Sequence, residues 1–99
     1  MPECGFIKAT NEAEGFMSVG WRFSPDKVFN RDKLTSLLTD ISAERIKAVF
    51  ITSTGVFGYN ATPDALSEVE LDDCLESRVE IISDEINDRL EARLLDCVS

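Results

Sequence analysis

The stretch RIKAVFIT, residues Arg45–Thr52, decides the fold of this chain. Successive side chains of a β-strand point to opposite faces of the sheet, so every second residue from Ile46 onward shares one apolar face. Val49 and Ile51 make the other face apolar midway along the stretch. A strand that is apolar on both faces is typical of the middle of a sheet, so we predict a central strand here.

A second stretch of the same type, SRVEII, follows at Ser77–Ile82. Both stretches carry cations near their start: Arg45 and Lys47 in the first, Arg78 in the second. A buried sheet needs no cation, so these three side chains are candidate interaction residues, although their stems could simply pack on the sheet while the charges stay in water. If the two strands pair, a parallel arrangement would bring their starts together and an antiparallel one would hold them apart. The sequence leaves both arrangements open.

The segment upstream predicts a strand and then a helix. Residues 17–24 alternate between apolar and polar or small side chains, which indicates a strand with one buried face. Trp21, the only tryptophan, lies on the apolar side of that strand and is either a core residue or an anchor for a partner. Asn30 can cap the helix that follows. The apolar stripe of this helix has helical spacing: Leu34, Leu37, Leu38 and Ile41.

Downstream, Thr54 and Gly55 indicate a hairpin turn into a third strand at residues 56–59. Residues 65–71 alternate weakly and predict an edge strand. A closing helix is indicated by apolar residues on one face: Ile86, Leu90, Leu94 and Cys97. Residues 1–14 show no period and are expected to be a lead-in segment before a single domain at 15–99. The predicted fold class is α+β: an antiparallel or mixed sheet of four to five strands with two helices packed on one face, in the order strand, helix, strands, helix.

Composition narrows the classes of partner. The 99 residues suit one domain, and 19 acidic against 10 basic residues give a net charge of −9. That sign disfavours nucleic acids and anionic membrane surfaces, because each phosphate needs a local cation. We find neither a charged-then-apolar leader nor an apolar run near the roughly 20 residues that cross a bilayer. The three cysteines are odd in number and lack C-x-x-C spacing, which favours reduced thiols in the cytoplasm.

The sequence offers little catalytic chemistry. It has no histidine, which excludes a Ser-His-Asp triad, a Cys-His pair and an imidazole metal site. It has no phosphate-binding loop. The alternative to be weighed is a thiol-carboxylate metal site at Cys74 with Asp72, Asp73 or Glu76, but acidic neighbours raise the pKa of a thiol and lower its reactivity. We therefore expect no catalytic residue and no cofactor in this chain.

The chain resembles the C-terminal domain of CobW-like proteins, which are metal-chaperone GTPases. Four short segments in this order carry the resemblance between about Phe16 and Cys97: WRF at Trp21–Phe23, the leucine-striped helix at 32–41, RIKA at Arg45–Ala48 and the SRVEII stretch. The chain departs from the family pattern in three ways. Ala48 stands where a glycine is common, the tryptophan often seen before the S-R pair is missing, and a histidine-rich metal tract is absent.

The resemblance implies a non-catalytic accessory or regulatory domain of a larger GTPase. GTP, Mg²⁺ and a transition metal would bind to an N-terminal domain of the parent protein, and nothing in this sequence matches that site. The implied partners are the parent's own GTPase domain and a metalloprotein client. The alternative function is metal handling by Cys74 with the neighbouring carboxylates.

Overall fold

Six strands and two helices make up the domain in the computed structural model, which describes residues 6–13, 15–41, 43–73, 76–83 and 89–98. Along the chain the elements follow the order β-β-α-β-β-β-β-α. The elements are β1 (Phe6–Ala13), β2 (Phe16–Phe23), α1 (Arg31–Asp40), β3 (Arg45–Thr52), β4 (Gly55–Ala61), β5 (Leu66–Leu71), β6 (Ser77–Ser83) and α2 (Leu90–Asp96).

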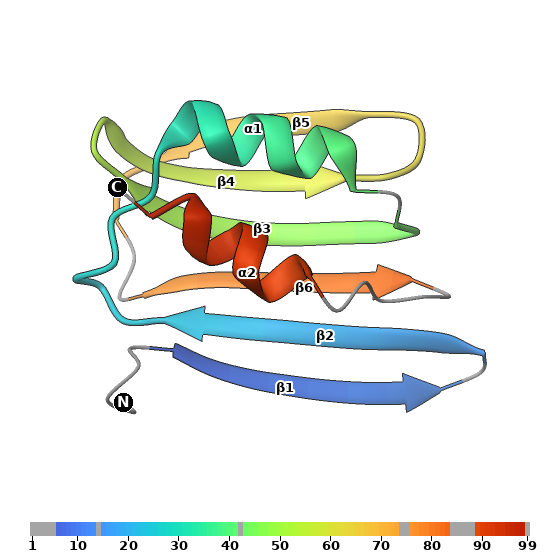
Figure 1. The fold of residues 1–99 in the computed structure, drawn as a ribbon. Helices are drawn as coiled ribbons and strands as arrows, with labels where there is room; N and C mark the ends of the chain where they lie inside the picture. The colour runs from blue at the N-terminus through green and yellow to red at the C-terminus, as the bar shows by residue number, and fades with distance from the viewer. Residues whose placement is uncertain (1–5, 14, 42, 74–75, 84–88, 99) are drawn as a thin grey trace.

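All six strands belong to one antiparallel sheet with the order β1-β2-β6-β3-β4-β5. The late strand β6 lies between the β1–β2 hairpin and the β3–β4–β5 meander. Both helices lie over the same face of the sheet (Figure 1). The predicted α+β class is confirmed, and the sheet has six strands where four to five were expected.

The additional strand is β1, which occupies most of the segment expected to be a lead-in before the domain. Residues 6–13 pair with β2 along their whole length, from Phe6 opposite Phe23 to Ala13 opposite Phe16. Gly15 lies in the connecting turn with a φ of 83°, a left-handed conformation that glycine adopts without strain. The lead-in prediction is therefore wrong for residues 6–13.

The core lies between the sheet and the helices. Alternate residues of β2, β3, β4 and β6 are buried on the helix-bearing face, as period-two patterning requires. Four aromatic rings cross this core in sequence, with centroid separations of 5.1 Å from Phe23 to Phe29, 4.7 Å from Phe29 to Phe50 and 6.1 Å from Phe50 to Tyr59. These separations fall in the range of favourable aromatic contacts.

The helices form where capping and apolar stripes favour them. The Asn30 side chain accepts a hydrogen bond of 3.0 Å from the Lys33 N–H and caps α1, as predicted. The buried residues of α1 are Leu34, Leu37 and Leu38, and those at α2 are Leu90, Leu94 and Cys97. Ile86, which we expected on the closing helix, lies outside the described residues.

Candidate functional site

The face of the sheet that the helices leave bare carries a group of basic side chains. Its exposed charged residues are Arg22 on β2, Arg45 and Lys47 on β3, and Arg78 and Glu80 on β6. The molecule measures only 21 Å along its shortest axis, which is the thickness of two layers. Four cations and the one carboxylate of Glu80 thus share this face, so positive charge is in excess here although the net charge of the chain is −9.

The pairing of β3 with β6 sets the spacing of the predicted cations. The two strands are antiparallel, with Arg45 opposite Ile82 and Val49 opposite Arg78. Arg45 and Arg78 therefore lie four positions apart, about 13 Å at the usual rise of a strand. Lys47 lies two positions from the Arg78 row and is its diagonal neighbour. Among the described residues, neither Arg45 nor Lys47 forms an ion pair.

Two further residues, the cation Arg22 and the carboxylate Glu76, belong to this site, and sequence reasoning did not group either of them with the cations. Arg22 lies directly opposite Arg78 in the β2–β6 pairing. Glu76, just before β6, contacts both guanidinium groups, at 2.7 Å from Arg22 Nη2 and 3.6 Å from Arg78 Nε. The hydrogen bonds from Arg22 are the main reason that the pKa of Glu76 is lowered. The available signal for Arg22 was its place among the polar or small residues of the predicted strand at 17–24, because these residues lie on the bare face of the sheet.

A shallow groove of about 440 Å³ runs across β1, β2, β6 and β3 between these charges. Its lining includes Ile7 and Ala9 of β1, Gly20 of β2, and the charged side chains named above except Arg45 and Glu76. A Cβ placed on Gly20 would meet only the Val79 carbonyl oxygen, at an ordinary 3.5 Å. The missing side chain of Gly20 therefore helps to keep the floor of the groove low, and a Cβ atom would fit there without a clash.

An apolar patch continues the same face toward the β5 edge. Ile51, Val56 and Leu71 form one cross-strand row, and Val49, Gly58 and Val69 form the next. Val69 is 59% exposed and Leu71 is 38% exposed. β5 is an edge strand, as the sequence predicted. We call the four cations, the groove and this apolar patch together the open face.

Trp21 lies on the opposite side of the sheet from the cations with which it was grouped. Its side chain is 1% exposed, and its Nε1 donates a hydrogen bond of 3.1 Å to Glu91 of α2. The Lys8 ammonium lies 5.5 Å from the centroid of its ring. Trp21 borders the groove, but its side chain is a core residue on the other side of the sheet from Arg45, Lys47 and Arg78.

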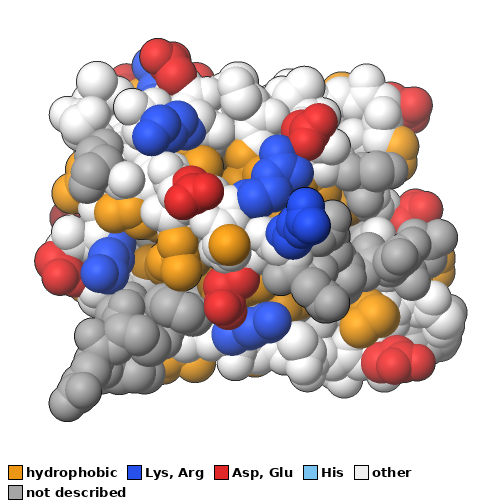
Figure 2. Space-filling model, viewed as in Figure 1, with side chains coloured by type: hydrophobic (Ala, Val, Ile, Leu, Met, Phe, Trp, Pro, Cys, Tyr) orange, Lys and Arg blue, Asp and Glu red, His pale blue; other side chains and the backbone are white. Residues whose placement is uncertain are grey.

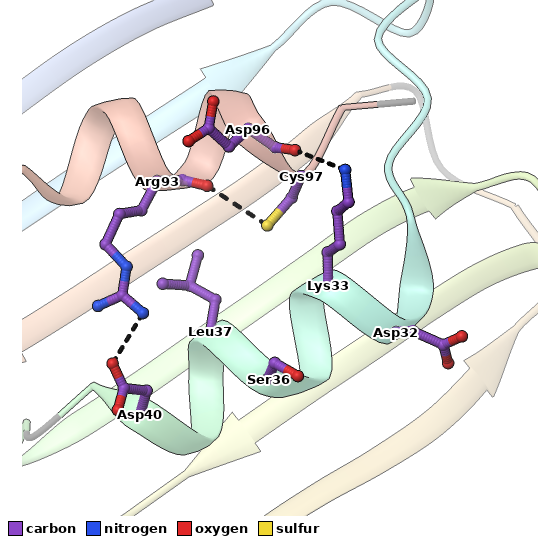
Figure 3. Close-up of a pocket in the computed structure, with 8 residues that line it drawn as sticks. All are labelled: Asp32, Lys33, Ser36, Leu37, Asp40, Arg93, Asp96 and Cys97. Atoms are coloured by element: carbon purple, nitrogen blue, oxygen red, sulfur yellow. Dashed lines mark hydrogen bonds and ion pairs between the residues drawn. The ribbon is translucent and has the colours of Figure 1, made fainter.

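A second hollow, of about 760 Å³, lies between the two helices (Figure 3). Arg93 Nη2 is 2.7 Å from Asp40 Oδ2 at one end, and Lys33 Nζ donates to the Asp96 carbonyl at 3.4 Å at the other. The Cys97 thiol donates to the Arg93 carbonyl, and burial raises the pKa of this thiol. A thiol with a raised pKa is a poor nucleophile at neutral pH. These contacts join α2 to α1, so we assign the hollow a structural role.

The helix-bearing face differs from the open face in its charge. Figure 2 shows basic and acidic side chains intermixed there around hydrophobic ones. In the described ranges, no three side chains of the types His, Cys, Asp and Glu gather closely enough to hold a metal ion. Asp72 and Asp73 are exposed, and Cys74, the thiol of the metal alternative, lies outside the described residues. None of the described helices is long and apolar enough to span a membrane.

Comparison of the chain with protein-family models, with curated proteins and with solved structures returned no match. The CobW-like resemblance therefore stays a prediction, and the chemistry of the open face is the main guide to function.

Proposed function

We propose that this domain is a non-catalytic protein-binding module, which docks an acidic and partly apolar segment of a partner protein on the open face. The observation that carries the proposal is the segregation of charge. Arg22, Arg45, Lys47 and Arg78 share the bare face of a sheet in a chain of net charge −9. Complementary charge steers association and selects partners, so an acidic partner is favoured and a basic one is disfavoured.

The apolar patch supports docking in preference to simple solvation of the cations. Exposed apolar side chains that adjoin one another and have a polar rim are typical of interaction sites. Val69 and Leu71 continue the rows of Val49 and Ile51 on the same face. The molecule measures 36 × 32 Å across its broad sides. That breadth accommodates the roughly 800 Å² that each partner contributes to a typical stable interface.

The proposal extends to the parent protein through the resemblance described above. As the accessory domain of a CobW-like GTPase, the module would use this face to contact the GTPase domain of the same protein or a metalloprotein client. GTP, Mg²⁺ and a transition metal belong to that other domain. The open face needs no catalytic residue for this role, since binding alone can link the state of one domain to another.

Peptides of defined charge test the docking proposal. Three peptides of equal length would be titrated by calorimetry: an amphipathic one of Glu and Leu, an amphipathic one of Lys and Leu, and a wholly polar one of Glu and Ser. We expect the Glu/Leu peptide to bind most tightly, with an affinity that falls as salt rises. We expect Lys47→Glu to weaken it by about three- to tenfold. Lys8→Glu is the matched control, because Lys8 pairs with Trp21 on the opposite face.

Three results would reject docking on the open face: no binding of the Glu/Leu peptide, equal binding of the Lys/Leu peptide, or an equal effect of both charge reversals. The GTPase partner has a separate test. An isolated CobW-like GTPase domain would be mixed with this domain, and the expected binding should weaken in Lys47→Glu. Absence of binding there rejects the GTPase partner alone.

A further inference from the structure

Arg22 and Arg78 form a like-charge pair that a nearby anion stabilises. They lie directly opposite each other on neighbouring strands. Residues in such positions have Cβ atoms only about 5 Å apart, and like charges there repel. Glu76 supplies the compensating charge. Its carboxylate accepts hydrogen bonds from Arg22 Nη2 at 2.7 Å and from Arg22 Nε at 3.0 and 3.1 Å. This is the two-pronged geometry in which guanidinium binds carboxylate.

The paired guanidinium groups remain accessible from solvent. The Arg22 side chain is 51% exposed and that of Arg78 is 63% exposed, whereas that of Glu76 is only 16% exposed. A guanidinium has five N–H donors, and the contacts to Glu76 use two nitrogens of Arg22 and one of Arg78. Lys47 lines the same groove directly opposite Glu80, but no ion pair within 4.0 Å joins Lys47 to any residue that the structure describes. The groove thus sets three cations against the two carboxylates of Glu76 and Glu80, which leaves an excess of positive charge.

We propose that Arg22, Arg78 and Lys47 form a carboxylate-binding site within the open face, and that Glu76 occupies this site in the free domain. An aspartate or glutamate side chain of the acidic partner segment takes the place of Glu76 on the arginines when the segment docks. This inference rests on the proposed function and adds the group that the site recognises. Glu76 acts as an internal competitor, so its strength as a ligand sets the affinity of the face for acidic segments.

Removal of the internal competitor tests the inference. In Glu76→Gln the carboxylate is lost while the shape of the side chain is kept. We expect the Glu/Leu peptide to bind about two- to fivefold more tightly, because its carboxylates no longer have to displace Glu76 from the arginines. The gain is small because an ion pair near the surface is weak. Glu70→Gln is the matched control. It removes the same charge from the helix-bearing side of the sheet, and it should change the peptide affinity by less than Glu76→Gln does. Unchanged or weaker binding by Glu76→Gln would overturn the inference while leaving the docking face in place.

A second measurement needs no peptide. The Nε–H NMR signals of Arg22 and Arg78 would be followed during titration with propionate, the simplest soluble carboxylate of suitable size. We expect both signals to move, and to approach saturation at a lower propionate concentration in Glu76→Gln than in the unmodified domain. Gly20→Val, which raises the groove floor, should weaken this response. If neither signal moves in either protein, the carboxylate site is rejected whatever the peptide does.

Discussion

Truncation of Phe29 should be the most damaging single change in the aromatic core. Phe29 lies between β2 and α1, is fully buried, and contacts Phe23 and Phe50 with ring separations of 5.1 and 4.7 Å. Its N–H also donates to the Ile51 carbonyl at 2.9 Å, which holds the segment against β3. Phe29→Ala therefore removes a ring that has neighbours on two sides and leaves the backbone that positions it in place.

The expected loss of unfolding free energy for Phe29→Ala is about 4 kcal/mol. Burying a phenylalanine contributes about 1.5–3 kcal/mol, and the cavity left in a packed core adds to that loss. Each aromatic contact contributes about 0.5–1.5 kcal/mol beyond area. The total free energy of unfolding of a domain of this size is typically about 5–15 kcal/mol, so the variant should be only marginally folded. Phe29→Leu keeps most of the volume and should cost about 1–2 kcal/mol.

Urea unfolding followed by Trp21 fluorescence measures these losses, because the only tryptophan is buried at 1% exposure and reports on the core. Phe16→Ala is the matched control. It is the same substitution at a residue that is 41% exposed, and it should cost less than about 1 kcal/mol. A loss below about 1.5 kcal/mol for Phe29→Ala, or an equal loss at Phe16, would refute the assignment of Phe29 to the centre of the core.

Three further outcomes are expected. Trp21→Phe removes the hydrogen bond to Glu91 and part of a buried ring, so it should cost about 1–2 kcal/mol in urea unfolding and leave peptide affinity unchanged; lost affinity with full stability would contradict the burial of Trp21. Asn30→Ala removes the α1 cap and should cost about 1 kcal/mol, with Asn30→Asp as the conservative control; equal losses in both variants would argue against capping. Hydrogen bonds from Arg31 lower the pKa of Glu68 below its ordinary 4.5, so its stabilising effect is present above that pH and is lost as the pH falls through the lowered pKa. The difference in urea midpoint between the unmodified domain and Glu68→Gln should therefore vanish in acid, and a difference that stays constant with pH would contradict this.

Elements with one buried face were predictable from sequence because burial imposes a period. The alternation ending at Phe23 and the leucine stripe after Asn30 were found in this way. The edge strand at 65–71 gave only a weak alternation, because Leu66 is the one residue of β5 that is partly buried. β1 was missed because it has no buried face that would impose such a period. Its described side chains from Ile7 to Glu12 are all exposed, so neither face selects apolar residues. The remaining signal was Gly15, which allows the tight turn that returns β1 onto β2.

The open face could be predicted only in part. The cations at Arg45, Lys47 and Arg78 stood out because they begin otherwise apolar strands, and the structure places all three on the bare side of the sheet. The pairing of Arg22 with Arg78 depends on the neighbour relation of β2 and β6. Local patterns do not encode which strands become neighbours, because pairing between distant segments depends on the energy of the whole sheet.

The position of β6 in the sheet also affects how the polypeptide folds during its synthesis on the ribosome. Met17 pairs with Ser83, and Ile46 pairs with Ile81, so one late segment joins two sheet fragments made much earlier. Until β6 has left the exit tunnel, the inner edges of β2 and β3 have no partner strand, and edges of that kind invite association with other chains. Such long-range closure also slows folding. Nascent chains that stall before residue 77 should therefore bind chaperones more than chains that stall after the domain is complete.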